Sequence, residues 1–383
     1  MKAGFILFFI VLVFQLLPVI GKQDPIILGS DNVDEELFIP CNIKIGPDKS
    51  IYAFDKKAQC IKVYSSETGK FLRKFGREGE APGEFLRFGS FNFTLDNMIF
   101  FVEAQNGHPW ITFMDLSGKY KKLLNIDRKN NYGFYYASML SDQRIIAEYF
   151  RYGILEKKAS FYVESFKTCI VIIDKNGQLS QPIIEKTIPF SISNTPNSTS
   201  KGIPFVADIS WDVSGDNRIL TCIKNLNILE LYDLKGKLIG KIKTPLPEAP
   251  KVTSKDIDKW KEEIKAKIVK DIGNEAFNNK FSMIMRYDGF LYDRKPIIDS
   301  IAVTPSNNIL ICEEKPEEVK ESKYHLINFK GESLIKITSR AYNITISKDF
   351  IVYVIDDEDE NPFTYCMKRK GSEKDDLSRI NNK

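Results

Sequence analysis

The sequence is poor in histidine, which restricts the catalytic chemistry that can be proposed for it. Its 383 residues include two histidines, His108 and His325. Zinc sites use nearby Cys and His pairs such as C-x-x-C, and the chain has no such pair. A nucleophilic Ser or Cys needs a base beside it, and no G-x-S-x-G motif occurs. The composition therefore argues against zinc catalysis and against a hydrolase triad.

The chain also lacks an excess of charge of one sign. Its 55 Lys and Arg residues oppose 51 Asp and Glu residues. Nucleic-acid-binding domains typically carry a strongly basic patch or stripe. The charge balance therefore predicts no nucleic-acid partner.

Long apolar runs are absent except at the N-terminus. Lys2 is followed by an apolar stretch over residues 5–17 that only Gln15 interrupts, and Pro18 ends it. The stretch is shorter than the roughly 20 residues that span a bilayer. A small residue, Gly21, then precedes a plausible cleavage point. We therefore expect residues 1–21 to be a signal peptide of an exported protein, periplasmic or extracellular, with an uncleaved anchor as the alternative and no membrane span after cleavage.

Six cysteines in an exported chain would ordinarily suggest disulfides. Their positions favour another interpretation, since Cys60, Cys169 and Cys366 occupy one strand type of the repeat described next. Cys222 and Cys312 share a second strand type. Cysteines at repeat-equivalent strand positions behave as small buried hydrophobes. We expect unpaired core thiols.

One unit, an apolar strand, a glycine turn and a second strand, recurs along the chain. It begins as CIKVYSSETGKFL over residues 60–72. Glycine in such a turn supplies the positive φ of a tight hairpin. The turn glycines are Gly69, Gly118, Gly177, Gly236, Gly331 and Gly371.

A second hairpin, such as NIKIGPDKSIYAF over residues 42–54, precedes each of these units. Four antiparallel strands in roughly 40–50 residues are typical of a β-propeller blade. The fold class is therefore all-β, with six four-stranded blades over residues 22–372. A two-layer sandwich would not explain the sixfold repeat. The polar residues 373–383 read as a tail, so we expect the strand at residues 25–28 to complete the last blade.

Two insertions interrupt the repeat. Residues 187–204 are rich in Ser, Thr, Asn and Pro and read as an exposed loop. Residues 250–280, between blades four and five, predict a helix because Thr253 and Asp256 resemble a capping box. Ile257, Trp260 and further apolar residues follow at helical spacing. The helix either lies across a blade or forms a lid over the channel.

Residues 76–85, GREGEAPGEF, follow FLRKF and a strand that ends at Asp55. This run resembles the segment that links blades in NHL-repeat proteins and related six-bladed propellers of the TolB/NHL type. The resemblance covers about 45 residues by motif and most of the chain by strand rhythm. It implies a six-bladed propeller and no particular activity, since propellers host many functions.

Some propellers that resemble this chain are lyases or lactonases that hold a divalent ion over the channel. Calcium would need only clustered oxygens, and Asp55, Glu103 and Glu313 follow apolar strands. Such acids more often cap loops by accepting backbone N–H bonds. A metal-dependent lyase or lactonase, with Ca²⁺ as its cofactor, is thus the alternative to a chain without cofactor or catalytic residues.

Our first hypothesis is an exported binding or scaffold module for a protein, peptide or glycan, acting as a monomer. In propellers, ligands usually meet the loops that lead into each innermost strand. Aromatic and arginine side chains there are typical of interfaces and ligand sites. The candidate binding residues are Arg77, Glu78, Arg87, Tyr135, Tyr136, Asp208, Arg294, Asp299 and Arg340.

Overall fold

The computed structural model describes most of the chain. The described residues are 25–29, 37–79, 81, 83–85, 88–103, 110–126, 133–157, 162–193, 201–202, 205–275, 277–278, 292–315, 319–356, 362–369 and 371–380. The expected signal peptide, residues 1–21, and the candidate Arg87 lie outside them. No helix in these ranges is long and apolar enough to cross a membrane.

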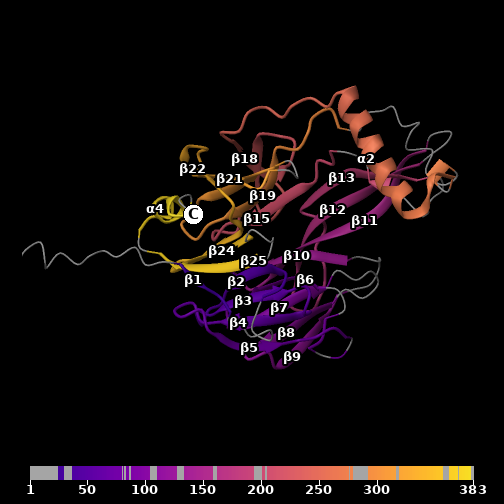
Figure 1. The fold of residues 1–383 in the computed structure, drawn as a ribbon. Coiled ribbons are helices and arrows are strands. Elements are labelled where there is room, and N and C mark those ends of the chain that lie inside the picture. The colour runs from indigo at the N-terminus through magenta and orange to yellow at the C-terminus, as the bar shows by residue number, and fades with distance from the viewer. Residues whose placement is uncertain are drawn as a thin grey trace, which may run out of the picture.

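The described strands form six antiparallel sheets that are arranged as the blades of a propeller (Figure 1). Blade one contains β2 (Pro40–Ile45), β3 (Ile51–Asp55), β4 (Cys60–Tyr64) and β5 (Phe71–Phe75). Blade two contains β6 (Phe88–Phe93), β7 (Met98–Glu103), β8 (Trp110–Asp115) and β9 (Tyr120–Asn125). The predicted fold class is confirmed.

Blades four to six follow the same order from the innermost strand outward. Blade four contains β15 (Ile209–Val213), β16 (Ile219–Ile223), β17 (Ile228–Tyr232) and β18 (Leu238–Lys243). Blade five contains β19 (Ile298–Val303), β20 (Ile309–Glu313), β21 (Ser322–Ile327) and β22 (Ser333–Ser339). Blade six contains β23 (Tyr342–Ile346), β24 (Phe350–Asp356), β25 (Pro362–Lys368) and β1 (Ile26–Ile27).

Blade three departs from the predicted pattern. It contains β10 (Gly133–Met139), β11 (Ile145–Lys157), β12 (Tyr162–Ile173), β13 (Ile184–Ser193) and β14 (Lys201–Gly202). The prediction of an exposed loop over 187–204 is wrong for residues 187–193, because β13 pairs with β12 as far as Ser193; residues 194–200 lie outside the described residues. The Ile, Thr and Phe residues of β13 suit a strand once a long partner is present.

The N-terminal strand β1 occupies the outermost position of blade six. Ile26 pairs with Cys366 and Ile27 with Tyr365 of β25. A Cβ added at Gly69, in the turn before β5, would overlap the Ile27 carbonyl oxygen. The equivalent Gly177 and Gly331 approach carbonyl oxygens at the ends of the preceding outer strands β9 and β18 in the same way. Strand β1 therefore contacts the turn glycine of blade one in the same way that other outer strands contact the turn glycine of the following blade.

Six hydrophobic clusters lie between neighbouring blades. One cluster joins Phe54 and Ile61 of blade one to Phe101 of blade two, and another joins Ile43 to Val352 of blade six. Strands β3 and β4 are consequently buried at every position. The face-to-face packing of apolar strands is that expected from the sequence. None of the six cysteines forms a disulfide, and four of them are buried.

Helix α2 (Ser254–Ile272) lies between β18 and β19 in the chain, and the predicted capping box of Thr253 with Asp256 is confirmed. Its apolar residues Trp260, Ile264 and Ile268 pack with Val163 of β12. Figure 1 shows α2 beside β11, β12 and β13 at the periphery of the propeller. The long strands of blade three thus provide the surface that covers the apolar stripe of α2.

Residues 373–380 are not a free polar tail. They contain helix α4 (Glu373–Ser378), and Leu377 and Ile380 are fully buried against blades five and six. Glu373 is buried and accepts hydrogen bonds from Thr304 Oγ1 at 2.6 Å and Asn308 Nδ2 at 3.0 Å. The polar composition predicted a free tail, but the carboxylates of α4 are buried and have partners on blade five and on Arg369.

We expect Glu373→Gln to destabilise the fold by about 1–3 kcal/mol at pH 7, because charge-assisted hydrogen bonds are lost. Burial raises the pKa of Glu373, but hydrogen bonds from Thr304, Asn308 and Ser306 outweigh this and lower it. The stabilisation by the Glu373 carboxylate should be complete above about pH 4.3, the ordinary pKa of a glutamate. It should disappear as the pH falls through the lowered pKa of the folded state. Urea unfolding across this range measures it, with exposed Glu67→Gln as control. Equal stability of Glu373→Gln and the parent at pH 7 would contradict the prediction.

Candidate functional site

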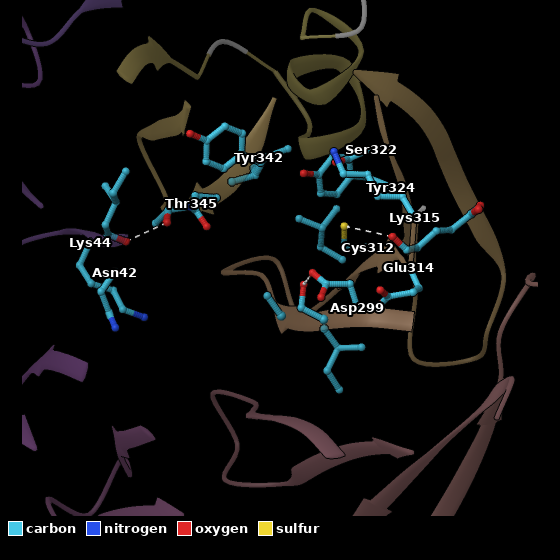
Figure 2. A pocket seen from close by; sticks show the side chains of 18 residues that line it. Asn42, Lys44, Asp299, Cys312, Glu314, Lys315, Ser322, Tyr324, Tyr342 and Thr345 are labelled. Atoms are coloured by element: carbon cyan, nitrogen blue, oxygen red, sulfur yellow. Dashed lines mark hydrogen bonds between the residues drawn. The ribbon is translucent and has the colours of Figure 1, made fainter. Parts of the chain in front are cut away.

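The centre of the propeller contains two adjoining cavities lined by innermost strands. The larger, about 730 Å³, lies among residues of β2, β19, β20, β21 and β23 (Figure 2). The smaller, about 300 Å³, extends toward β10 and β15. Lys44, Ala302 and Thr345 are among the residues that line both. Together the cavities form one channel lined by both polar and apolar residues.

Irregular pairing of the innermost strands places polar residues on the channel wall. In β2 the register shifts between Cys41 and Ile43, and the intervening Asn42 has a φ of 52°. In β19 the shift lies between Ile298 and Ser300, so that Asp299 is the extra residue. A bulge re-aims the side chain it contains. Asn42 and Asp299 both line the larger cavity.

Short polar side chains join the innermost strands of neighbouring blades. Thr345 Oγ1 donates to the Ile43 carbonyl oxygen at 2.8 Å, which links blade six to blade one. The Val303 N–H donates to Asp212 Oδ2 at 2.8 Å, which links blade five to blade four. These bonds satisfy backbone groups at the inner edge of each sheet, which would otherwise face the channel unpaired.

Lys44 places an ammonium group in the channel. Its Nζ lies 5.8 Å from the centroid of the Tyr136 ring. It forms no hydrogen bond or ion pair with the part of the chain that the structure describes. Burial lowers the pKa of Lys44, and the negative charge of Asp212 opposes this change. A cation held among protein groups without a paired anion is an unusual feature.

Asp212 is already satisfied by other donors. The N–H groups of Val213 and Val303 donate to its carboxylate, each at 2.8 Å, and the phenol of Tyr136 forms a further hydrogen bond. Burial nevertheless raises the pKa of Asp212. The charge of Asp212, followed by burial, raises the pKa of Tyr136. Tyr136 therefore acts as a neutral donor at ordinary pH.

Glu148 and Trp211 form a second polar pair on the smaller cavity. Trp211 Nε1 donates to Glu148 Oε2 at 2.8 Å, and the Tyr136 ring lies edge-on to Trp211 with centroids 5.1 Å apart. Burial raises the pKa of Glu148 to about 7, although the bond from Trp211 acts in the opposite direction. The pair can change charge near neutral pH.

The mouth of the larger cavity carries two exposed carboxylates, Asp299 and Glu314. Burial and then the charge of Asp299 raise the pKa of Glu314, while Lys224 lowers it. Figure 2 shows both carboxylates on the side of the cavity opposite Lys44.

The sequence-predicted candidates divide into two groups. Tyr136 and Asp299 line the channel cavities. Asp208 influences the pKa of Glu148, and Tyr135 is 42% exposed, with its ring 4.8 Å from that of Phe150.

Like Asp208 and Tyr135, the remaining described candidates do not line either cavity. Arg77 pairs with Glu84 at 2.5 Å, and Glu78 forms a bridge to Phe85 within the blade-linking loop. Arg294 donates to the Ala249 carbonyl oxygen at 2.7 Å, and Arg340 is half-buried after β22. These contacts belong to loops outside the channel.

Two of the three acids that the sequence suggested for calcium, Asp55 and Glu313, have other partners. Asp55 is fully buried, accepts the Phe38 N–H at 3.1 Å and pairs with Lys62 at 3.1 Å. Glu313 pairs with His325 at 2.5 Å. No group of three or more His, Cys, Asp or Glu residues is placed to hold a metal within the ranges described above.

Sequence reasoning missed Lys44, Asp212 and Glu148. Lys44 and Asp212 are charged residues inside short innermost strands, NIKI and ISWDV. In a propeller, the inner edge of such a strand faces the channel, so the charges themselves were the available signal. Glu148 lies in the apolar run IIAEY and offered a similar signal.

Comparison with known proteins agrees with this architecture. A family model described as TolB-like 6-blade propeller-like matches residues 30–270. A search of proteins with curated functions gave no match.

Several solved structures are similar. A DUF4221 family member from Bacteroides vulgatus has a TM-score of 0.50 at 9% identity, covering 91% of this chain and 98% of that one. A Bacteroides fragilis protein described as exported has a TM-score of 0.48 at 11% identity, covering 91% and 95%. Virginiamycin B lyase from Staphylococcus aureus has a TM-score of 0.42 at 10% identity, covering 90% and 99%. At these identities the likeness concerns the fold alone.

We expect the fluorescence of Trp211 to change with a midpoint near pH 7, because Glu148, whose pKa is about 7, ionises there. An unperturbed glutamate would titrate near pH 4.3. Fluorescence titration from pH 5 to 9 measures the transition. Glu148→Gln and Trp211→Phe should each remove it, whereas Trp260→Phe should not. A transition that survives in Glu148→Gln would contradict the assignment.

Proposed function

This chain belongs to the TolB-like six-blade propeller family, and we propose that it is an exported binding module without catalysis of its own. Its ligand is part of a peptide, glycan or protein partner, and the binding site is the mouth of the channel. The larger cavity is the observation that carries this proposal, because its volume of about 730 Å³ is typical of ligand pockets.

The composition of the cavity wall also supports binding. Apolar residues such as Ile43, Ile301 and Leu310 lie beside polar groups from Asn42 and Tyr324. Ligand sites combine a mostly apolar wall with a few polar groups that orient the ligand. The strands hold these groups on rigid elements, so little ordering cost accompanies binding.

Export is supported by the leader-like sequence of residues 1–21. We propose a periplasmic or extracellular location on this basis. Of the acids first considered for a divalent ion, Asp55 and Glu313 are engaged by Lys62 and His325. Their pairing supports a binding role over the metal-dependent lyase or lactonase.

Ala302 lines both cavities, so Ala302→Phe should fill the channel and weaken binding by roughly tenfold or more. Calorimetric titration with a panel of short peptides and oligosaccharides measures this effect. Ala58→Phe, on the exposed turn between β3 and β4, is the matched control and should bind as the parent does. Ligands should be recovered chemically unchanged with or without added Ca²⁺.

Two outcomes would overturn the proposal. Equal affinity of Ala302→Phe, Ala58→Phe and the parent for every ligand that binds would place binding outside the channel. Conversion of a ligand that stops in the presence of a chelator would favour the metal-dependent enzyme.

A further inference from the structure

The larger cavity has opposite charges on opposite walls. Lys44 lies on β2 of blade one, while Asp299 lies on β19 and Glu314 directly follows β20 of blade five. Figure 2 shows Lys44 on one side of the open space and the two acids on the other. A ligand in this cavity would meet a cation on one side and two anions on the other.

The ammonium of Lys44 is available to a ligand. It has no hydrogen-bond or ion-pair partner among the residues that the structure describes, and its Nζ lies over the face of the Tyr136 ring. Asp212, the acid that influences it most, already receives two backbone N–H bonds and the Tyr136 phenol. A carboxylate from a ligand would supply the missing charge-assisted hydrogen bond.

The two acids at the mouth are available as well. Asp299 accepts only a 3.3 Å bond from Ser300 Oγ, and neither Asp299 nor Glu314 forms an ion pair within the described ranges. Lys315, on the same wall, is directed elsewhere, because its Nζ donates to the Lys320 carbonyl oxygen at 3.0 Å. The charge of Lys224 already acts on Glu314, and a further cation placed between the two neighbouring carboxylates would relieve their repulsion.

We propose that the channel binds a short peptide with free termini, its carboxylate at Lys44 and its ammonium at Asp299 and Glu314. This inference rests on the proposed function and names the ligand class for the same site. A peptide site needs a cation such as the unpaired Lys44 to hold the carboxylate, whereas a site for a bare cation would use the acids alone. Apolar residues that line the same cavity, Ile301 and Ile344 among them, would contact the peptide side chains.

Calorimetry with trialanine at pH 7.5 tests the proposal. The parent protein should bind the free peptide roughly tenfold more tightly than its N-acetyl form and roughly tenfold more tightly than its C-amide. Lys44→Met should weaken binding of the free and acetylated peptides and leave the amide unchanged. Asp299→Asn should weaken binding of the free and amidated peptides and leave the acetylated one unchanged.

Lys330→Met, on an exposed turn of blade five, is the matched control and should bind all three forms as the parent does. Equal binding of the three forms by the parent would overturn the inference, even if a variant did not fold. Loss of binding in a chelator would also overturn it, since a metal ion would then hold the peptide.

The two proposals can fail separately. If trialanine does not bind but another ligand responds to Ala302→Phe, the peptide inference fails and the binding function stands. If no ligand responds to Ala302→Phe, the binding function fails as well.

Discussion

The channel depends on hydrogen bonds between the innermost strands of neighbouring blades. Each such strand has one edge with no strand beside it, and an unpaired backbone edge is costly when enclosed. Thr345, Asp212 and Ser210 supply side-chain oxygens that bond to the next blade along the channel wall. These bonds hold the blades at a fixed distance and keep the centre open. Polar side chains thus satisfy the inner strand edges, while apolar residues of the same strands also line the cavities.

The same arrangement explains how the ring is held together further out. Apolar clusters between blades bury both faces of the middle strands, so each blade depends on its neighbours for its core. At the seam, β1 provides the outer strand of blade six, and Leu28 packs beside Ile51 of blade one. Helix α4 spans blades five and six on the outside. Strand β1 and helix α4 therefore pack at the positions where the repeat stops.

The sequence was sufficient for the blades and insufficient for the site. The strand pattern and the turn glycines depend on local backbone geometry, and Gly69 and Gly177 do adopt positive φ as expected. The capping box at Thr253 is equally local. Channel residues are different, because a one-residue bulge moves the following side chains to the other face of a strand. The bulge at Asn42 cannot be predicted from the alternation of apolar and polar residues, so Lys44 was not recognised as a channel residue. Strand β13 was missed because it depends on its long partner β12.

The most direct test of this account is a crystal structure of the protein soaked with trialanine. The account predicts peptide density in the channel, with the terminal carboxylate within hydrogen-bonding distance of Lys44 Nζ and the terminal nitrogen beside Asp299 and Glu314. Peptide bound on the outer faces of the blades, with an empty channel, would contradict it.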